Sequence, residues 1–156
     1  MPPPPFPSIQ PAPDRRAARY FLVQAAVGAY FWFVVTGSAE GHELFDLLPG
    51  HPEVTDRFLL PDLVAIATSL ASAWALWWGR AWAPVAVAFT TGCIVYPTVS
   101  LLGWAGASSG GANALIVMVP PSLIGLALTW RTWLRSQPHR GAPPDAPSEG
   151  LARPLG

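Results

Sequence analysis

Four long apolar segments alternate with short polar stretches along the chain. They cover residues 19–36, 61–78, 81–104 and 112–134, and an earlier start of the second segment, at Phe58, is also consistent with the pattern. Each is close to the roughly 20 residues that a helix needs to cross a hydrocarbon core about 30 Å thick. Because backbone N–H and C=O groups find no water inside a bilayer, a spanning segment satisfies them by forming a helix. The pattern therefore predicts an all-α integral membrane protein, with a four-helix bundle formed by residues 15–135.

The two ends of the chain lack this pattern. Residues 1–14 are rich in proline, which has no backbone N–H and disfavours helix at the residue before it. Residues 136–156 have the polar, proline-containing composition of a disordered segment. We therefore expect both ends to be disordered. The first does not resemble a cleavable signal peptide, because its charges follow the prolines.

The composition supports a membrane protein. Apolar residues make up 51% of the chain and charged residues 12%, about half the usual share of a soluble domain. The formal net charge of zero gives no reason to expect a nucleic-acid partner. The basic residues are all arginine, which hints at a GC-rich bacterial genome. The single cysteine, Cys93, excludes an internal disulfide and chemistry that needs a cysteine pair.

The arginines predict the orientation of the bundle. With four spans, one side of the membrane receives Arg15, Arg16, Arg19, Arg80, Arg131, Arg135 and Arg140, and the other side receives Arg57. Positive residues are enriched in cytoplasmic loops, so both termini are expected in the cytoplasm and the protein in the inner (plasma) membrane. Tryptophans gather near the same predicted boundaries, as an interfacial aromatic belt does.

The polar stretch 37–60 is the predicted outer loop. Glu40, Glu43 and Asp46 recur at every third residue, and apolar residues lie between or just after them, namely Leu44, Phe45, Leu47 and Leu48. This pattern favours a short helix lying in the membrane interface. The same stretch allows a second interpretation, a divalent metal site formed by His42, Asp46 and His51, because imidazole and carboxylate groups suit zinc and related ions. No HExxH motif or histidine pair four residues apart accompanies these residues. No other cofactor is predicted.

The predicted spans carry charge only at their ends, where Arg19, Asp62, Arg80 and Arg131 lie. Asp62 directly follows Pro61 and fits the first turn of the second helix, where a carboxylate meets the positive end of the helix dipole. Proton-coupled transporters and ion pumps normally need a charged group at mid-depth, so this arrangement argues against both classes.

A stripe of hydroxyl side chains runs through the second and third segments. It includes Ser69, Ser72, Thr90, Thr91 and Thr98. Small and hydroxyl side chains let membrane helices pack closely and form hydrogen bonds across their interface. The alternative is a pocket between the second, third and fourth helices, in which Thr91, Tyr96 and Asn113 would contact a lipid, a quinone or another amphipathic molecule.

Three function classes follow from these features. The sequence favours a non-catalytic structural or accessory subunit of a larger membrane complex, whose partners are the lipid bilayer and other membrane subunits or further copies of itself. The first alternative is binding or transport of a small amphipathic molecule. The second is a membrane enzyme or metal site that uses the outer loop.

Overall fold

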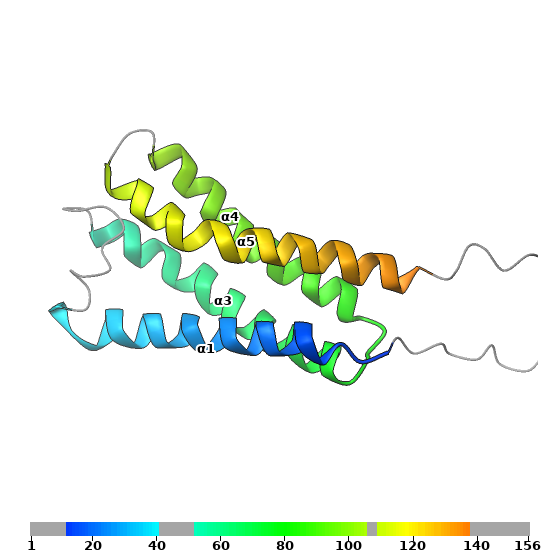
Figure 1. The fold of residues 1–156 in the computed structure, drawn as a ribbon. Helices are drawn as coiled ribbons and strands as arrows, with labels where there is room; N and C mark the ends of the chain where they lie inside the picture. Colours follow the sequence, from blue (N-terminus) through cyan, green and yellow to red (C-terminus); the bar gives the residue numbers. More distant parts are fainter. Residues whose placement is uncertain (1–11, 41–51, 106–108, 138–156) are drawn as a thin grey trace, which may run out of the picture.

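The computed structural model describes residues 12–40, 52–105 and 109–137. These residues include no strand, and they contain the helices α1 (Arg15–Gly37), α3 (Pro52–Trp77), α4 (Ala83–Ala105) and α5 (Ser109–Ser136) (Figure 1). All four contain a stretch long and apolar enough to cross a membrane, namely Arg15–Gly37, Thr55–Trp77, Ala83–Gly103 and Leu115–Ser136. The described part of the chain is therefore all-helical, with four candidate membrane spans, as the hydropathy pattern predicts.

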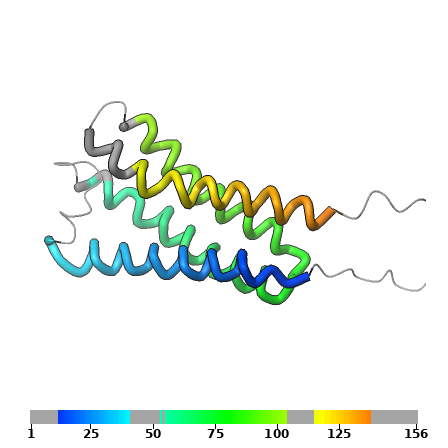
Figure 2. Tube along the Cα trace, in the orientation of Figure 1, coloured from blue at the N-terminus to red at the C-terminus, as the bar shows by residue number. Residues whose placement is uncertain are grey.

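The helices pack in the order of the chain. α1 packs on α3, α3 on α4, and α4 on α5, so the molecule consists of two helical hairpins joined through α3 and α4. Figure 2 shows both described ends of the chain at one end of the bundle, next to the turn between α3 and α4. We call this end the base. The opposite end, where α1 ends and α3 begins, is called the far end.

Helix α1 begins with an N-cap at the base. The Asp14 carboxylate accepts a hydrogen bond from the backbone N–H of Ala17, at 3.2 Å. Such a bond satisfies one of the N–H groups that the first turn of a helix leaves without a partner, and it stabilises the helix by about 1 kcal/mol. The backbone N–H of Asp14 also donates to the carbonyl of Leu76, which ties the start of α1 to the end of α3.

Helix α3 begins earlier than the hydropathy pattern predicts. It starts at Pro52, whereas the second apolar segment starts at Pro61, which lies inside the helix. Proline at the first position of a helix needs no hydrogen-bond partner for its nitrogen, and Glu53 places a carboxylate near the positive end of the dipole. Helical structure therefore covers residues 52–60, which the sequence assigned to the outer loop.

The turn between α3 and α4 is a glycine-terminated helix end. Gly79 has φ 59°, the left-handed conformation that a side chain disfavours. Its N–H donates to the carbonyl of Leu76, and the N–H of Arg80 donates to the carbonyl of Ala75. These two bonds satisfy carbonyls at the end of α3 in the manner of a Schellman motif. The turn fixes the position of Arg80 at the base.

The buried core lies at the base, where the hairpins meet. It consists mostly of small side chains, with one aromatic ring, and comprises Ala17, Ala18, Phe21, Ala73, Ala75, Leu76, Ala83 and Val87. Alanines allow the helix backbones to approach closely, which is the usual basis of helix association in membranes. The hairpins are thus held together most tightly at the base.

Candidate functional site

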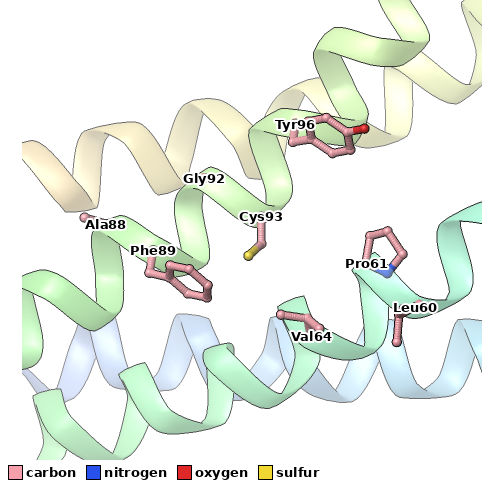
Figure 3. A pocket seen from close by; sticks show the side chains of 8 residues that line it. All are labelled: Leu60, Pro61, Val64, Ala88, Phe89, Gly92, Cys93 and Tyr96. Atoms are coloured by element: carbon pink, nitrogen blue, oxygen red, sulfur yellow. The ribbon is translucent and has the colours of Figure 1, made fainter.

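An apolar groove separates α3 from α4 beyond the base. The two helices are in contact where Ser72 and Thr90 share a buried hydrogen bond of 2.9 Å. Nearer the far end they leave a cavity of about 630 Å³, lined by Leu60, Pro61, Val64, Ala88, Phe89, Gly92, Cys93 and Tyr96 (Figure 3). This volume lies within the range of about 300 to 1,000 Å³ that is typical of sites for small molecules.

The lining of the groove is apolar except at a few atoms. Leu60, Val64 and Phe89 supply hydrocarbon and aromatic surface, while Tyr96 supplies a hydroxyl group. Sites for small molecules commonly combine such an apolar wall with a few polar groups that set the orientation of the ligand. Leu60, Phe89 and Tyr96 are 72%, 59% and 65% exposed, so the groove opens sideways, toward the space that lipid would occupy.

Proline and glycine shape the two walls. Pro61 removes one backbone hydrogen bond from α3 at the groove, because its nitrogen carries no hydrogen. On the facing wall, a Cβ atom built at Gly92 would meet no atom within 4 Å. The missing side chain at Gly92 therefore leaves free space in the groove.

The structure separates the residues that the sequence grouped as ligand contacts. Tyr96 lines the groove, whereas Thr91 is only 3% exposed and forms a 2.8 Å hydrogen bond with Thr129 of α5. Asn113 lies near the start of α5, and its side chain is outside the described part. The described contacts thus place Tyr96 at the groove and Thr91 at the interface between α4 and α5.

Other hydroxyl side chains of the stripe form hydrogen bonds between helices. Thr98 of α4 bonds to Ser122 of α5 at 2.8 Å, and Gln24 of α1 donates to Ser69 of α3 at 3.3 Å. Together with the Ser72–Thr90 and Thr91–Thr129 bonds, these link each helix to its neighbour. Each bond of this kind contributes about 0.6 to 2 kcal/mol in a membrane protein.

The residues of the proposed metal site, His42, Asp46 and His51, lie outside the described residues. Within residues 12–40, 52–105 and 109–137, no group of three or more histidine, cysteine, aspartate or glutamate side chains could hold a metal ion. The metal site in the outer loop stays a prediction.

A second polar feature, which the sequence did not indicate, lies between α1 and α3. The indole N–H of Trp32 donates to a carboxylate oxygen of Asp62 at 3.0 Å. Because α3 begins at Pro52, Asp62 lies within the helix and not in its first turn, about 10 Å along the axis from Thr55 at a rise of 1.5 Å per residue. An ionisable side chain inside a span is a candidate for function. The sequence does contain a signal for this earlier helix start. A proline followed by an acidic residue, here Pro52 and Glu53, is typical of the first turn of a helix.

A comparison of the chain with protein families, curated proteins and solved structures finds no match.

Proposed function

We propose that the protein spans the bacterial plasma membrane with its base, and hence both chain ends, on the cytoplasmic side. The support is an asymmetry of charge among the described residues. Six arginines and one aspartate lie at the base, namely Arg15, Arg16, Arg19, Arg80, Arg131, Arg135 and Asp14. The far end carries Glu40, Glu53, Asp56 and Arg57. Cytoplasmic ends of membrane helices are the ones enriched in arginine.

Cysteine labelling in intact cells tests this orientation. In a Cys93→Ala background, Ser109→Cys places a thiol at the start of α5 and Ser136→Cys places one at its end. We expect a membrane-impermeant maleimide to label the first in intact cells and the second only after permeabilisation. Labelling of the Ser136→Cys variant in intact cells would overturn the orientation.

We infer further that the protein binds one amphipathic molecule of the membrane, such as a lipid or a quinone, in the groove between α3 and α4. The observation that carries this function is the open apolar cavity of about 630 Å³, which has Tyr96 among its lining residues. The hydrocarbon part of the ligand lies along Leu60, Val64 and Phe89, and Tyr96 donates a hydrogen bond to its polar group. The ligand enters from the bilayer, because the groove opens sideways.

Native mass spectrometry of protein extracted from its own membrane in mild detergent tests this function. We expect the wild-type chain to carry an added mass of lipid or quinone size. Gly92→Leu fills the groove, since a Cβ at this position meets nothing within 4 Å, and should remove the added mass. Gly103→Leu is the matched control, because Gly103 is also a glycine of α4 with no atom within 4 Å of a built Cβ, and it lies outside the groove.

The contribution of the hydroxyl group is tested separately. Tyr96→Phe keeps the ring and removes the hydrogen bond, so retention of the ligand should fall by about five- to tenfold, the equivalent of a bond of about 1 kcal/mol or slightly more. Tyr30→Phe, at a tyrosine of α1 that is 67% exposed, is the control. If Gly92→Leu and Tyr96→Phe both retained the ligand as the wild-type protein does, binding in the groove would be overturned.

An accessory subunit of a larger membrane complex is the second candidate function. It is supported by the same groove, since a cleft between two hairpins that opens sideways also suits a helix of a partner subunit. In the same mass spectrum, membrane subunits that co-purify in a fixed ratio would favour this function over ligand binding. An added mass the size of a metal ion would instead favour the histidines of the outer loop.

A further inference from the structure

Among the described residues, the base of the bundle carries more arginine than acidic residues can neutralise. Asp14 is the only acidic residue at the base within the described part, and its side chain is 11% exposed. One of its carboxylate oxygens accepts from Arg131 at 2.8 Å and from Arg135 at 2.7 Å. The carboxylate is therefore occupied by the arginines of α5, while Arg15, Arg16, Arg19 and Arg80 have no carboxylate within salt-bridge distance among the described residues.

Two of these arginines lie over tryptophan rings at the end of α3. The guanidinium carbon of Arg15 is 5.7 Å from the centre of the Trp77 ring, and that of Arg80 is 5.0 Å from the centre of the Trp74 ring. Trp74 and Trp77 are three residues apart, so they are neighbours on the helix surface. Both arginines are exposed. The two guanidinium groups thus lie within cation–π distance of rings on adjacent turns of α3.

Further tryptophans lie at the base of the bundle. Trp78, Trp82, Trp130 and Trp133 are all exposed at the base, by 43% to 66%. The Trp82 ring also lies 5.7 Å from that of Trp74. Exposed tryptophans on membrane helices mark the level of the lipid headgroups. The stacked arginines therefore lie where phosphate groups of lipids would be found.

We propose that Arg15 and Arg80, held on Trp77 and Trp74, bind the phosphate of an anionic membrane lipid such as phosphatidylglycerol. A guanidinium group presents a planar set of N–H donors that matches phosphate oxygens, and stacking on an indole ring restricts its motion before the lipid binds. The excess of positive charge at the base selects an anionic headgroup over a zwitterionic one. This inference rests on the proposed membrane insertion but not on a ligand in the groove.

The test is a competition between lipids in detergent micelles. The full-length protein is mixed with equal amounts of phosphatidylglycerol and phosphatidylcholine, and native mass spectrometry counts the bound lipids. We expect the wild-type protein to retain phosphatidylglycerol preferentially. The double variant Arg15→Gln/Arg80→Gln should reduce this preference by about tenfold or more for each arginine removed. Each substitution removes a charge-assisted hydrogen bond to phosphate, which is stronger than the general attraction of a surface arginine to anionic lipid.

Two controls separate the stacked pair from a general effect of charge. Arg16→Gln/Arg19→Gln removes two exposed arginines near the start of α1, neither of which lies over a tryptophan ring. This variant should reduce the preference for phosphatidylglycerol less. Arg57→Gln, at the far end, should leave it unchanged. Equal losses in the two double variants would overturn the specific site. Circular dichroism should show the same helix content in all variants, because the substituted side chains are exposed.

Other outcomes would also overturn the proposal. They are an equal retention of the two lipids by the wild-type protein, and displacement of phosphatidylglycerol by inorganic phosphate, which would indicate a site for free anions. A loss of the preference in Gly92→Leu would place the anionic lipid in the groove instead. A detergent micelle does not distinguish a cytoplasmic from an outer side. The lipid competition therefore does not depend on the orientation of the protein, and the labelling experiment can fail without affecting it.

Discussion

Trp32 and Asp62 form the contact between side chains of α1 and α3 that most depends on charge. Trp32 is 5% exposed, and its N–H faces a carboxylate inside the candidate span Thr55–Trp77. A hydrogen bond to an ionised group contributes about 1.5 to 3 kcal/mol, against about 0.6 kcal/mol for a typical bond between membrane helices. Trp32→Phe should lower the free energy of unfolding by about 1.5 to 3 kcal/mol in addition to the packing cost of the smaller ring, measured by SDS titration in mixed micelles.

The same substitution in an Asp62→Asn background separates the effect of charge from that of packing. The asparagine side chain keeps an oxygen acceptor but carries no charge. Trp32→Phe should therefore cost about 1 to 2 kcal/mol less in this background, while the packing cost of the smaller ring is the same in both. Equal costs in the two backgrounds would mean that the carboxylate charge does not strengthen this bond.

The position of Asp62 shows what a hydropathy pattern leaves open at a single residue. Pro61 begins an apolar run in the sequence, and a carboxylate that follows a proline is typical of a first helical turn. In the structure the helix has already begun before Pro61, so the same carboxylate lies deeper and faces α1. Thr91 and Tyr96 are a second case. Their residue types suit a ligand site, but which face of α4 each occupies depends on how α3 and α5 pack on it.

At the scale of the helix pair, the packing of α4 on α5 depends on a glycine. A Cβ built at Gly125 would lie 3.1 Å from the Thr91 hydroxyl oxygen and 3.3 Å from its methyl carbon. Gly125→Ala should therefore push the two helices apart and disturb the Thr91–Thr129 bond, at a cost of about 1 to 3 kcal/mol for overpacking. The measurement is the free energy of unfolding in mixed micelles. Gly103→Ala is the control, since a Cβ there meets no atom; equal stability of the two variants would contradict this close contact.

The end of α3 depends on a second glycine for a different reason. At Gly79, with φ 59°, the problem for a side chain is the backbone conformation. Gly79→Ala should cost about 1 to 2 kcal/mol, because a Cβ in the left-handed region clashes with the backbone. Thermal unfolding followed by circular dichroism would measure this cost. Gly79→Asn should be less destabilising, since asparagine tolerates that region better, and the reverse order would rule out backbone strain as the cause.

The helices themselves could be predicted from sequence because lipid leaves the backbone few alternatives. The apolar runs correspond to α1, α4 and α5 within a few residues at each end. The start of α3 could not be read from hydropathy, since residues 52–60 mix charged with apolar side chains and belong to the helix nonetheless. The groove was even less accessible to prediction, because it depends on how far α3 and α4 separate beyond Ser72 and Thr90.

For the whole molecule, the base connects all four helices while the groove opens nearer the far end. The first and last helices meet at the base through Asp14 and the two α5 arginines, and α1 also contacts α5 where the Tyr20 hydroxyl donates to the carbonyl of Pro121 at 3.1 Å. The side chains that make these contacts are not among those that line the groove. Ligand binding and stability should therefore respond to different substitutions.

Asp14 offers the sharpest test of that separation, because substitutions can remove the three hydrogen bonds of its side chain selectively. Asparagine is as good an N-cap as aspartate, so Asp14→Asn keeps the cap on α1 and removes the charge that holds Arg131 and Arg135. The loss should be about 1 kcal/mol, since both arginines are about half exposed and such ion pairs are weak. Asp14→Ala should cost about 1 kcal/mol more by removing the cap.

The stability of both variants is measured by SDS titration. The difference in unfolding free energy between wild type and Asp14→Asn should narrow in about 1 M salt, which screens exposed charges. Retention of the groove ligand should be unchanged in Asp14→Asn, whereas a parallel loss of ligand would show that the base and the groove act as one unit.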